Sequence, residues 1–258
     1  MKKFIFLVVV FFCLPLMNYA QTNWSILSDT INTLDQHNLK QGFWVEENVD
    51  KTSSRGNYNN GKKEGSWIEY NNYGVLKKIE TYRNGIRNGL FINIDKRGYF
   101  EAEEYFKNDE LEGWSRHYSF GGRPISEIFY INGKIEGLKK LYYHDSGKLQ
   151  EESYYKNGKK NGVSKWYNNQ GKLIAEYYYV NGEFEGEQRT FYPNDTVQSI
   201  EIYSGNKRVG EYKEFFSNGK FKVLGKYEND TKEGRWIFYD ETGDVIDIKK
   251  YKDGEEKL

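Results

Sequence analysis

The stretch YNNGKKEG at residues 58–65 returns almost unchanged as YKNGKKNG at residues 155–162. Diverged copies read YRNGIRNG at 82–89, YINGKIEG at 130–137 and YVNGEFEG at 179–186. Self-similarity at a fixed spacing is the signature of a repeat architecture, in which each copy is one supersecondary unit. The chain is therefore expected to fold as an array of similar units.

The aromatic residue that opens each copy recurs every 24 residues, apart from one interval of 25 near residues 144–147. This first row consists of Tyr58, Tyr82, Phe106, Tyr130, Tyr155, Tyr179, Tyr203, Tyr227 and Tyr251. Seven residues later a second row is glycine in every unit: Gly65, Gly89, Gly113, Gly137, Gly162, Gly186, Gly210 and Gly234. A third, mostly aromatic row follows twelve residues in, and a fourth, mostly glycine row lies beyond it. Four rows of residues with the same spacing indicate about eight units.

Each unit carries two groups of turn-forming residues. Asn-Gly is the strongest short signal for a tight hairpin turn, and glycine accepts the positive φ that such turns need. Between the turns lie runs such as SWIEY at 66–70 and VLKKIETY at 75–82, rich in Trp, Ile, Tyr and Val, which favour strands. The prediction is an all-β fold, an elongated antiparallel β-meander or solenoid of about eight 24-residue two-stranded repeats. The glycines of the second row are predicted as structural turn residues.

Proline is rare in the expected strands, as strand pairing requires. At Pro124 the aliphatic position held by Leu76 and Leu149 in other units slips to Ile125, so a local irregularity is expected there. About sixteen strands at roughly 4.8 Å each would give a length on the order of 75 Å. Whether the array stays open or closes does not follow from the pattern.

The chain begins MKKFIFLVVVFFCLPLMNYAQ, with two lysines, an apolar core and a small residue near Gln21. This order is typical of a secretory signal peptide. The predicted organisation is a signal peptide at 1–20, a lead segment at 21–41 and the repeat array at 42–258. The protein is therefore expected to be exported, to the periplasm, the cell envelope or the extracellular space.

Removal of residues 1–20 would take away the single Cys and leave 36 Lys and Arg against 38 Asp and Glu, a net charge of −2. Such a chain would form no disulfide and has no basic excess for a phosphate backbone, so nucleic acid is not expected as a partner. The three histidines, His37, His117 and His144, lie in different units without metal-ligand spacing. With no nucleophile motif or phosphate loop, we expect no enzyme activity and no cofactor.

The pattern Tyr-x-Asn-Gly-x-x-x-Gly-x-Trp-x-x-Tyr-x-x-x-Gly-x-Leu, clearest at 58–76, resembles the MORN-repeat variant of bacterial proteins. The resemblance covers about residues 42–258, with Gly42 and Trp44 as a truncated first unit. This variant recurs in the YwqK-like antitoxin family, which implies a role in binding and neutralising another protein. MORN repeats are also associated with membrane lipids and with protein scaffolding.

Three functions stay open at this point: a protein-interaction scaffold, including an antitoxin or immunity role; a binder of cell-wall carbohydrate; and a lipid-associated envelope element. The partner is expected to be a protein, with glycan or lipid as alternatives. Aromatic residues that break the repeat pattern are the candidate binding residues, because the fold does not require them. They are Trp114, Tyr143, Trp166, Tyr177 and Tyr178. The alternative is that these side chains are additional packing in the middle of the array.

Overall fold

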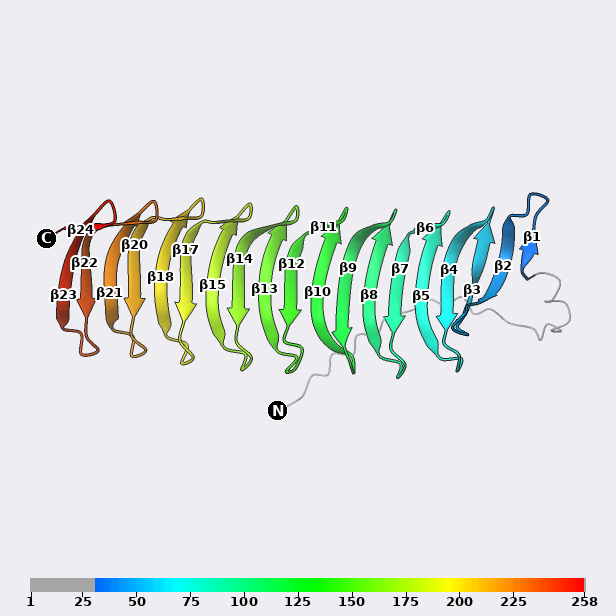
Figure 1. The fold of residues 1–258 in the computed structure, drawn as a ribbon, viewed down its shortest axis with the longest axis horizontal. Helices are drawn as coiled ribbons and strands as arrows, with labels where there is room; N and C mark the ends of the chain where they lie inside the picture. The colour runs from blue at the N-terminus through cyan, green and yellow to red at the C-terminus, as the bar shows by residue number, and fades with distance from the viewer. Residues whose placement is uncertain (1–30, 258) are drawn as a thin grey trace, which may run out of the picture.

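The computed structural model describes residues 31–257. The predicted signal peptide at 1–20 and residues 21–30 of the lead segment lie outside this described part. Within it, the chain forms one open antiparallel sheet (Figure 1). The strands are β1 (Thr33–Leu34), β2 (Lys40–Glu47), β3 (Ser53–Asn59), β4 (Lys62–Tyr70), β5 (Leu76–Arg83), β6 (Ile86–Arg87), β7 (Gly89–Ile94), β8 (Phe100–Lys107), β9 (Glu110–Ser119), β10 (Arg123–Ile131), β11 (Lys134–Ile135), β12 (Gly137–Tyr142), β13 (Leu149–Lys156), β14 (Lys159–Tyr167), β15 (Leu173–Val180), β16 (Glu183–Phe184), β17 (Gly186–Phe191), β18 (Val197–Ser204), β19 (Lys207–Arg208), β20 (Gly210–Phe215), β21 (Phe221–Glu228), β22 (Thr231–Tyr239), β23 (Val245–Lys252) and β24 (Glu255–Lys257).

Each strand pairs with the strands before and after it in the chain, so the sheet is a continuous meander. The two-residue strands β6, β11, β16 and β19 pair with the same preceding strands as β7, β12, β17 and β20 do, and form the first part of those strands. The predicted all-β meander of two-stranded repeats is confirmed. The sheet is open, which the sequence pattern left undecided.

The tight turns at one long edge of the sheet stack on one another. Asn60 and Gly61 both have positive φ, at 49° and 74°, as a two-residue type I′ hairpin turn requires. In the next unit the Gly85 amide donates to the Lys63 carbonyl oxygen of the preceding unit at 2.8 Å. The predicted turns at Asn-Gly are therefore present, and each one is hydrogen-bonded to its neighbour along the array.

The second-row glycines lie inside strands and not in turns, so their assignment as turn residues is wrong. Gly65 is within β4 and pairs with Tyr82 of β5. On the other side of β4 the register shifts between Arg55 and Asn57 of β3, which marks a bulge. The Gly65 φ is +71°. A bulge needs this left-handed conformation just as a turn does, and the sequence signal is the same for both.

The opposite long edge carries the longer turns that end at the fourth row. At Pro124 the register shifts by one residue, as expected. The same shift occurs between Glu69 and Tyr70, where β4 meets β5, and at the matching place in the other units of the array. The irregularity is therefore a general feature of the unit, and Pro124 is accommodated in it.

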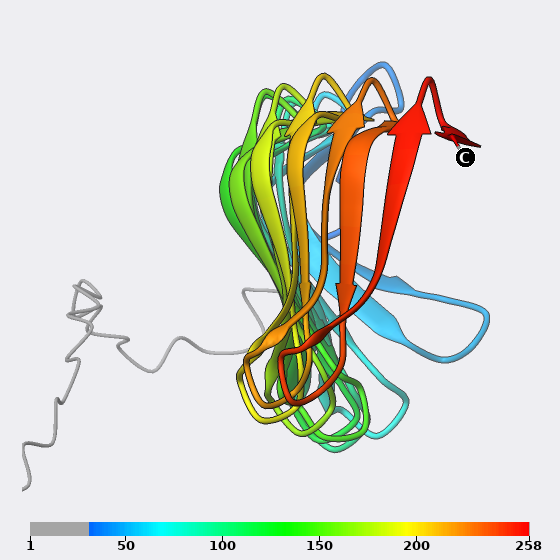
Figure 2. The same ribbon diagram turned by 90° about the vertical axis from the view of Figure 1, so that its left-hand side faces the viewer.

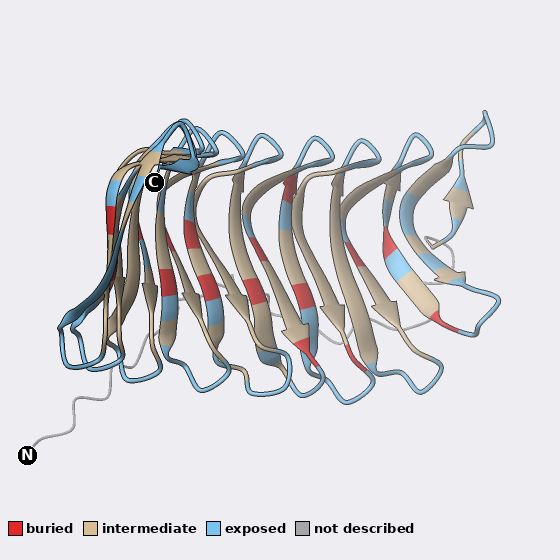
Figure 3. Ribbon diagram, turned by 60° about the vertical axis from the view of Figure 1, so that its left-hand side comes forward, coloured by how far each residue is buried: buried red, intermediate tan, exposed pale blue. Residues whose placement is uncertain are grey.

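The sheet is a single layer, and its side chains are packed along strands rather than between layers. Most buried positions form short bands across the middle of the strands, while most residues of the turns at both edges are exposed (Figure 3). Buried apolar residues are few: Trp67, Ala102, Phe106, Ala175, Val223 and Trp236. Viewed along the long axis, the strands bend and successive hairpins rotate, as expected for a twisted sheet (Figure 2).

The described part of the lead segment lies against the first unit. β1 pairs with β2 through Thr33 and Gln41, and an isolated bridge joins Ile31 to Phe43. The β2 strand already begins at Lys40. The start of the array is therefore covered by its own preceding segment.

Candidate functional site

Because side chains alternate across a strand, each unit contributes to two separate faces. Face A carries the first-row aromatics; Tyr58, for example, has its ring 5.8 Å from Trp44 and 4.8 Å from Trp67, centroid to centroid. Face B carries the third row, such as Tyr118, whose ring is 6.4 Å from Phe100. Both rows are thus ladders of aromatic side chains, on opposite sides of one sheet.

On face A, lysine and arginine side chains lie over the aromatic rings. Lys63 Nζ is 4.4 Å from the Trp67 ring centroid and 5.1 Å from that of Tyr82. The same nitrogen is 4.0 Å from Glu80 Oε2. The cation–ring contact is repeated in other units by Lys40, Lys160, Arg208 and Lys232, and by Arg87 over Phe106. Face A is therefore a row of aromatic and cationic groups that mostly satisfy one another.

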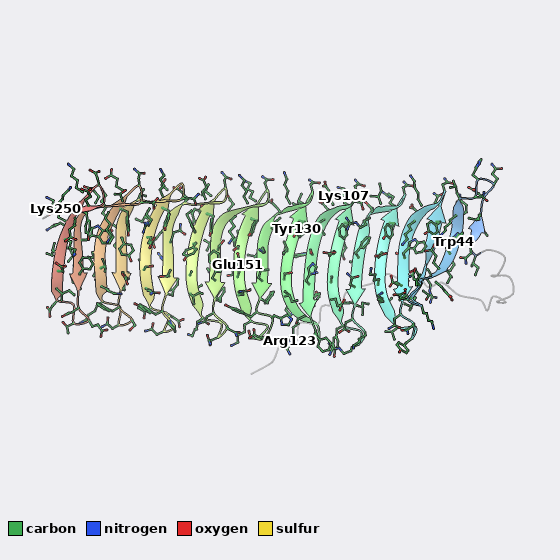
Figure 4. All side chains as sticks on the ribbon, viewed as in Figure 1. Trp44, Lys107, Arg123, Tyr130, Glu151 and Lys250 are labelled. Atoms are coloured by element: carbon green, nitrogen blue, oxygen red, sulfur yellow. The ribbon has the colours of Figure 1, made fainter. Side chains whose placement is uncertain are left out.

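Two of the predicted binding residues, Trp166 and Tyr177, lie together on face A. Their ring centroids are 5.0 Å apart, and Trp166 lies across the strand pair from Ala175. Lys160 Nζ lies 4.4 Å from the Trp166 ring and 2.8 Å from Glu151 Oε1. Glu151 itself lies near the middle of β13 (Figure 4). Both aromatic side chains are half-buried, so they pack and remain accessible.

Trp114 and Tyr178 lie on face B, away from that pair. Tyr178 follows Tyr177 directly and so points to the other side of β15. It is 42% exposed and Trp114 is 36% exposed. Trp114 packs against Phe129 with ring centroids 5.3 Å apart, and the Arg116 guanidinium lies 4.8 Å from its ring. The two residues come from separate hairpins and do not form one patch.

Tyr143 lies at the edge of the sheet, in the turn after β12. Its hydroxyl donates to the carbonyl oxygen of Tyr167 at 2.7 Å, which ties one turn to the next unit. Tyr192 makes the corresponding bond to the Phe215 carbonyl at 2.9 Å. Tyr143 therefore has a repeated structural role, and the five predicted residues separate into two on face A, two on face B and one at an edge.

A groove opens on face A beside Tyr177, with a volume of about 260 Å³. It is lined by Tyr177, Phe184, Gln188, Thr190, Ser199, Glu201 and Tyr203. The rings of Tyr177 and Phe184 meet edge-on at 5.4 Å, and Phe184 is 5.3 Å from Tyr203. Burial raises the pKa of Tyr177. The groove thus combines three aromatic rings with four polar side chains, one of which is a carboxylate.

Most polar groups in this groove already have partners. The Gln188 amide nitrogen donates to three backbone carbonyls, and its oxygen accepts from the Tyr178 amide at 2.8 Å. The Thr190 and Ser199 hydroxyls are hydrogen-bonded to each other at 2.7 Å. The Tyr203 hydroxyl donates to Glu201 at 2.8 Å, and burial followed by this hydrogen bond raises the Tyr203 pKa.

Sequence reasoning missed Phe184, Glu201 and Tyr203. A usable signal exists for Phe184, because it stands five residues into its unit, where Lys63, Lys160 and Lys232 stand in others. Tyr203 belongs to the first row, which the fold explains, so the repeat pattern does not single it out. Its environment, however, depends on the neighbouring unit.

Within residues 31–257, no group of three or more His, Cys, Asp or Glu side chains is arranged to hold a metal ion. In the same part of the chain, no helix has the length and apolar character needed to cross a membrane.

Comparison with known families matches five segments of the array, at residues 138–157, 160–181, 184–204, 208–229 and 232–253. These five units match the MORN repeat variant. Each segment contains one of the longer turns and the strands on either side of it. Units before residue 138 have the same strand pairing. The MORN-variant units carry the groove, which lies within the second and third matched segments.

No curated protein matches the chain. Two solved structures that it resembles are titled "Crystal Structure of TcdB2-TccC3-Cdc42" and "Crystal Structure of TcdB2-TccC3". They share 8% and 9% sequence identity with it, and each match covers 86% of this chain and 15% of the other, with a TM-score of 0.20. A TM-score of 0.20 supports no inference from those proteins to this one.

Proposed function

We propose that this protein is an exported, non-enzymatic scaffold that binds a protein partner across face A, centred on the hairpins from β14 to β18. The observation that supports this most is the groove beside Tyr177, an aromatic surface that the regular face A pattern does not fill. Tyr and Trp are the residue types most enriched where protein interfaces gain their binding energy. Tyr177 lines the groove, and Trp166 extends the aromatic surface by packing against Tyr177.

An array of this kind suits a long partner, because every unit presents the same kind of surface at a regular interval. The strands that carry the surface are already paired, so little backbone needs to be ordered on binding. An antitoxin or immunity role is a specific form of this proposal, in which the bound protein is a toxin. Export by the segment at 1–20 would place that toxin outside the cytoplasm.

Carbohydrate is the second candidate, because aromatic rings also stack on sugars. A sugar presents many hydroxyls that need hydrogen-bond partners. In this groove the Gln188 amide, the Thr190 and Ser199 hydroxyls and the Tyr203 hydroxyl are all bonded within the protein. The groove therefore fits an apolar or cationic protein side chain better than a sugar ring. Anionic lipid is also less suited to a chain whose mature charge would be −2.

The test is site-specific photo-crosslinking in the organism that makes the protein. A photoreactive amino acid replaces Tyr177 on face A and, as the matched control, Tyr178 on face B. The proposal expects a discrete protein adduct from position 177 and none from position 178. Adducts of lipid or glycan at position 177, or the same protein adduct from both faces, would contradict it.

A second measurement separates binding from stability. The double variant Trp166→Ala with Tyr177→Ala is compared with Tyr178→Ala for capture of the crosslinked protein and for urea unfolding. We expect the double variant to lose capture while Tyr178→Ala retains it. Loss of capture that only follows a lowered unfolding midpoint would assign Trp166 and Tyr177 to packing.

A further inference from the structure

Comparing the units shows that the groove occupies the place of a missing cation. The fifth residue of a unit is basic in five of the complete units, at Lys63, Arg87, Lys160, Arg208 and Lys232. Each of these puts its charge over an aromatic ring of face A at 4.1–4.4 Å. In the unit that begins at Tyr179, the fifth residue is Phe184.

The carboxylate that such a cation would face is still present. Two residues before the first-row aromatic, three units carry a glutamate: Glu80, Glu104 and Glu201. Glu80 lies 4.0 Å from Lys63 and 3.6 Å from Lys78, and Glu104 lies 3.2 Å from His117. Among residues 31–257, no Lys, Arg or His nitrogen lies within 4.0 Å of the Glu201 carboxylate. Glu201 accepts a hydrogen bond from Tyr203 and also lines the groove.

From this comparison we infer that the groove bounded by Tyr177, Phe184, Glu201 and Tyr203 is a receptor for a lysine or arginine side chain of the protein partner. The inference rests on the proposed scaffold function and specifies the chemistry of its contact. The incoming charge would meet Glu201 and the Tyr203 ring, the same combination that Lys63 meets at Glu80 and Tyr82. Its aliphatic stem would lie along Phe184 and Tyr177.

The surroundings favour this occupant over an uncharged one. A carboxylate next to aromatic faces attracts a cation by both charge and ring quadrupole. The residues lining the groove include Glu201 and no basic side chain. The charge of Arg208 acts on Glu201 and Tyr203 from outside the lining, at more than 4.0 Å from the Glu201 carboxylate. The groove is also large enough for the end of a long side chain, at about 260 Å³. A partner with a protruding basic residue fits both its shape and its charge.

Direct titration with small probes tests this independently of the natural partner. The full exported chain, with its tyrosines isotopically labelled, is titrated with Nα-acetyl-lysine N-methylamide and followed by NMR of the Tyr177 and Tyr203 rings. The matched probe is Nα-acetyl-norleucine N-methylamide, which has the same stem without the charge. We expect saturable shifts with the lysine probe and affinity at least about tenfold weaker with norleucine.

Three variants test which residues of the groove bind the charged probe. Glu201→Gln keeps a hydrogen-bond acceptor for Tyr203 and should weaken the lysine probe about tenfold. Glu80→Gln is the matched control, and binding should not change. Phe184→Lys supplies the cation from within the chain and should abolish probe binding. Urea unfolding of each variant verifies that it is folded.

Equal affinity for the lysine and norleucine probes, or unchanged lysine binding in Glu201→Gln or Phe184→Lys, would overturn the inference. Tighter binding of choline than of the lysine probe would also overturn it, by assigning the groove to a quaternary ammonium group. The scaffold proposal is judged separately: a protein crosslinked at position 177 that persists in Phe184→Lys would preserve the scaffold and reject the cation site. Binding of the lysine probe without any protein adduct would preserve the cation site and reject the scaffold.

Discussion

Trp67 lies flat against Gly56 on the neighbouring strand, so closely that a Cβ on Gly56 would come within 2.5 Å of the indole. Trp236 has the same relationship with Gly225 near the other end of the array, where the distance would be 2.4 Å. Neither glycine has a positive φ, so the lack of a side chain is required by the indole and not by the backbone. Trp67 and Trp236 are 1% and 2% exposed, which makes each pair a local core in a single-layer sheet.

We predict that Gly225→Ala lowers the free energy of unfolding by about 2 kcal/mol, because the methyl group forces the indole of Trp236 to move. Urea unfolding followed by tryptophan fluorescence measures it. Gly234→Ala is the control with a different mechanism: its φ is +70° and no atom lies within 4 Å of its Cβ position. That variant should cost about 1 kcal/mol through backbone strain alone. A larger effect at Gly234 than at Gly225 would contradict the packing argument.

The second-row glycines should tolerate branched residues poorly. Gly162 has φ +112°, and its Cβ position lies 3.4 Å from Tyr154 Cβ. We expect Gly162→Val to lower the urea midpoint by an amount equivalent to about 2 kcal/mol, since a β-branched residue resists this φ. Lys156→Val, on an exposed strand position, is the control and should stay within about 0.5 kcal/mol of the parent. An unchanged midpoint for Gly162→Val would show that the bulge does not require glycine.

Neighbouring units are coupled through the glutamate that precedes the second-row glycine. Glu136 Oε2 accepts a hydrogen bond from the Asn157 amide in the next tight turn at 2.7 Å. Glu136→Ala should cost about 1 kcal/mol and make the Asn157 amide exchange faster with solvent. Glu136→Gln should retain most of the protection, as Asn161 does for Asn181 with a neutral oxygen at 3.2 Å. Equal exchange at Asn157 in both variants would exclude this coupling.

Acid stability should depend on Glu151. Burial acts to raise its pKa, but hydrogen bonds from Lys160 and Ser153 outweigh this and hold the pKa below its ordinary value. A depressed folded pKa contributes stability above the unfolded pKa of about 4.3, and this contribution is lost as pH falls through the folded value. Parent and Glu151→Gln should therefore differ in unfolding midpoint at pH 7 and converge below about pH 4. A difference that stays constant from pH 7 to pH 3 would contradict the depressed pKa.

Hydrogen exchange should be slowest in the central hairpins and fastest at both ends, because a terminal strand has one neighbour. β24, paired to β23 through three residue pairs, should exchange among the fastest. Uniform exchange rates from β2 to β24 would contradict a stacked array.

The residues that specify the sheet could be recognised without the structure, because they act locally. An Asn-Gly pair sets its own turn through positive φ, and alternating aromatic and polar residues set the faces of a strand. The second-row glycines show the limit of this reasoning. Their need for positive φ was evident, but bulges and turns share that need, and only the register between β3 and β4 distinguishes them.

The contacts of the candidate binding residues were predicted less well for a related reason. Trp166 and Tyr177 were singled out as departures from the pattern, and they do lie together. Tyr143 also departs from the pattern, yet its hydroxyl bonds to the backbone of the next unit. An aromatic residue that breaks the repeat pattern can be available for binding or can serve the fold. Which of the two holds depends on atoms about one unit away, and the residue's own position in the sequence does not reveal them.

The sequence by itself determined the repeat, the strand content and the tight turns that follow the first-row aromatics, because these depend on backbone preferences within a few residues. The tertiary structure decided which side chains meet across strands. Phe184 and Glu201 lie 17 residues apart, in adjacent strands of the array, and only the register brings them to one groove. Glu201 has no ion-pair partner within 4.0 Å among residues 31–257, because Phe184 stands where another unit has lysine, and Arg208 acts on its charge only from farther away. Such a charge relationship between two units exists only once the strands are paired.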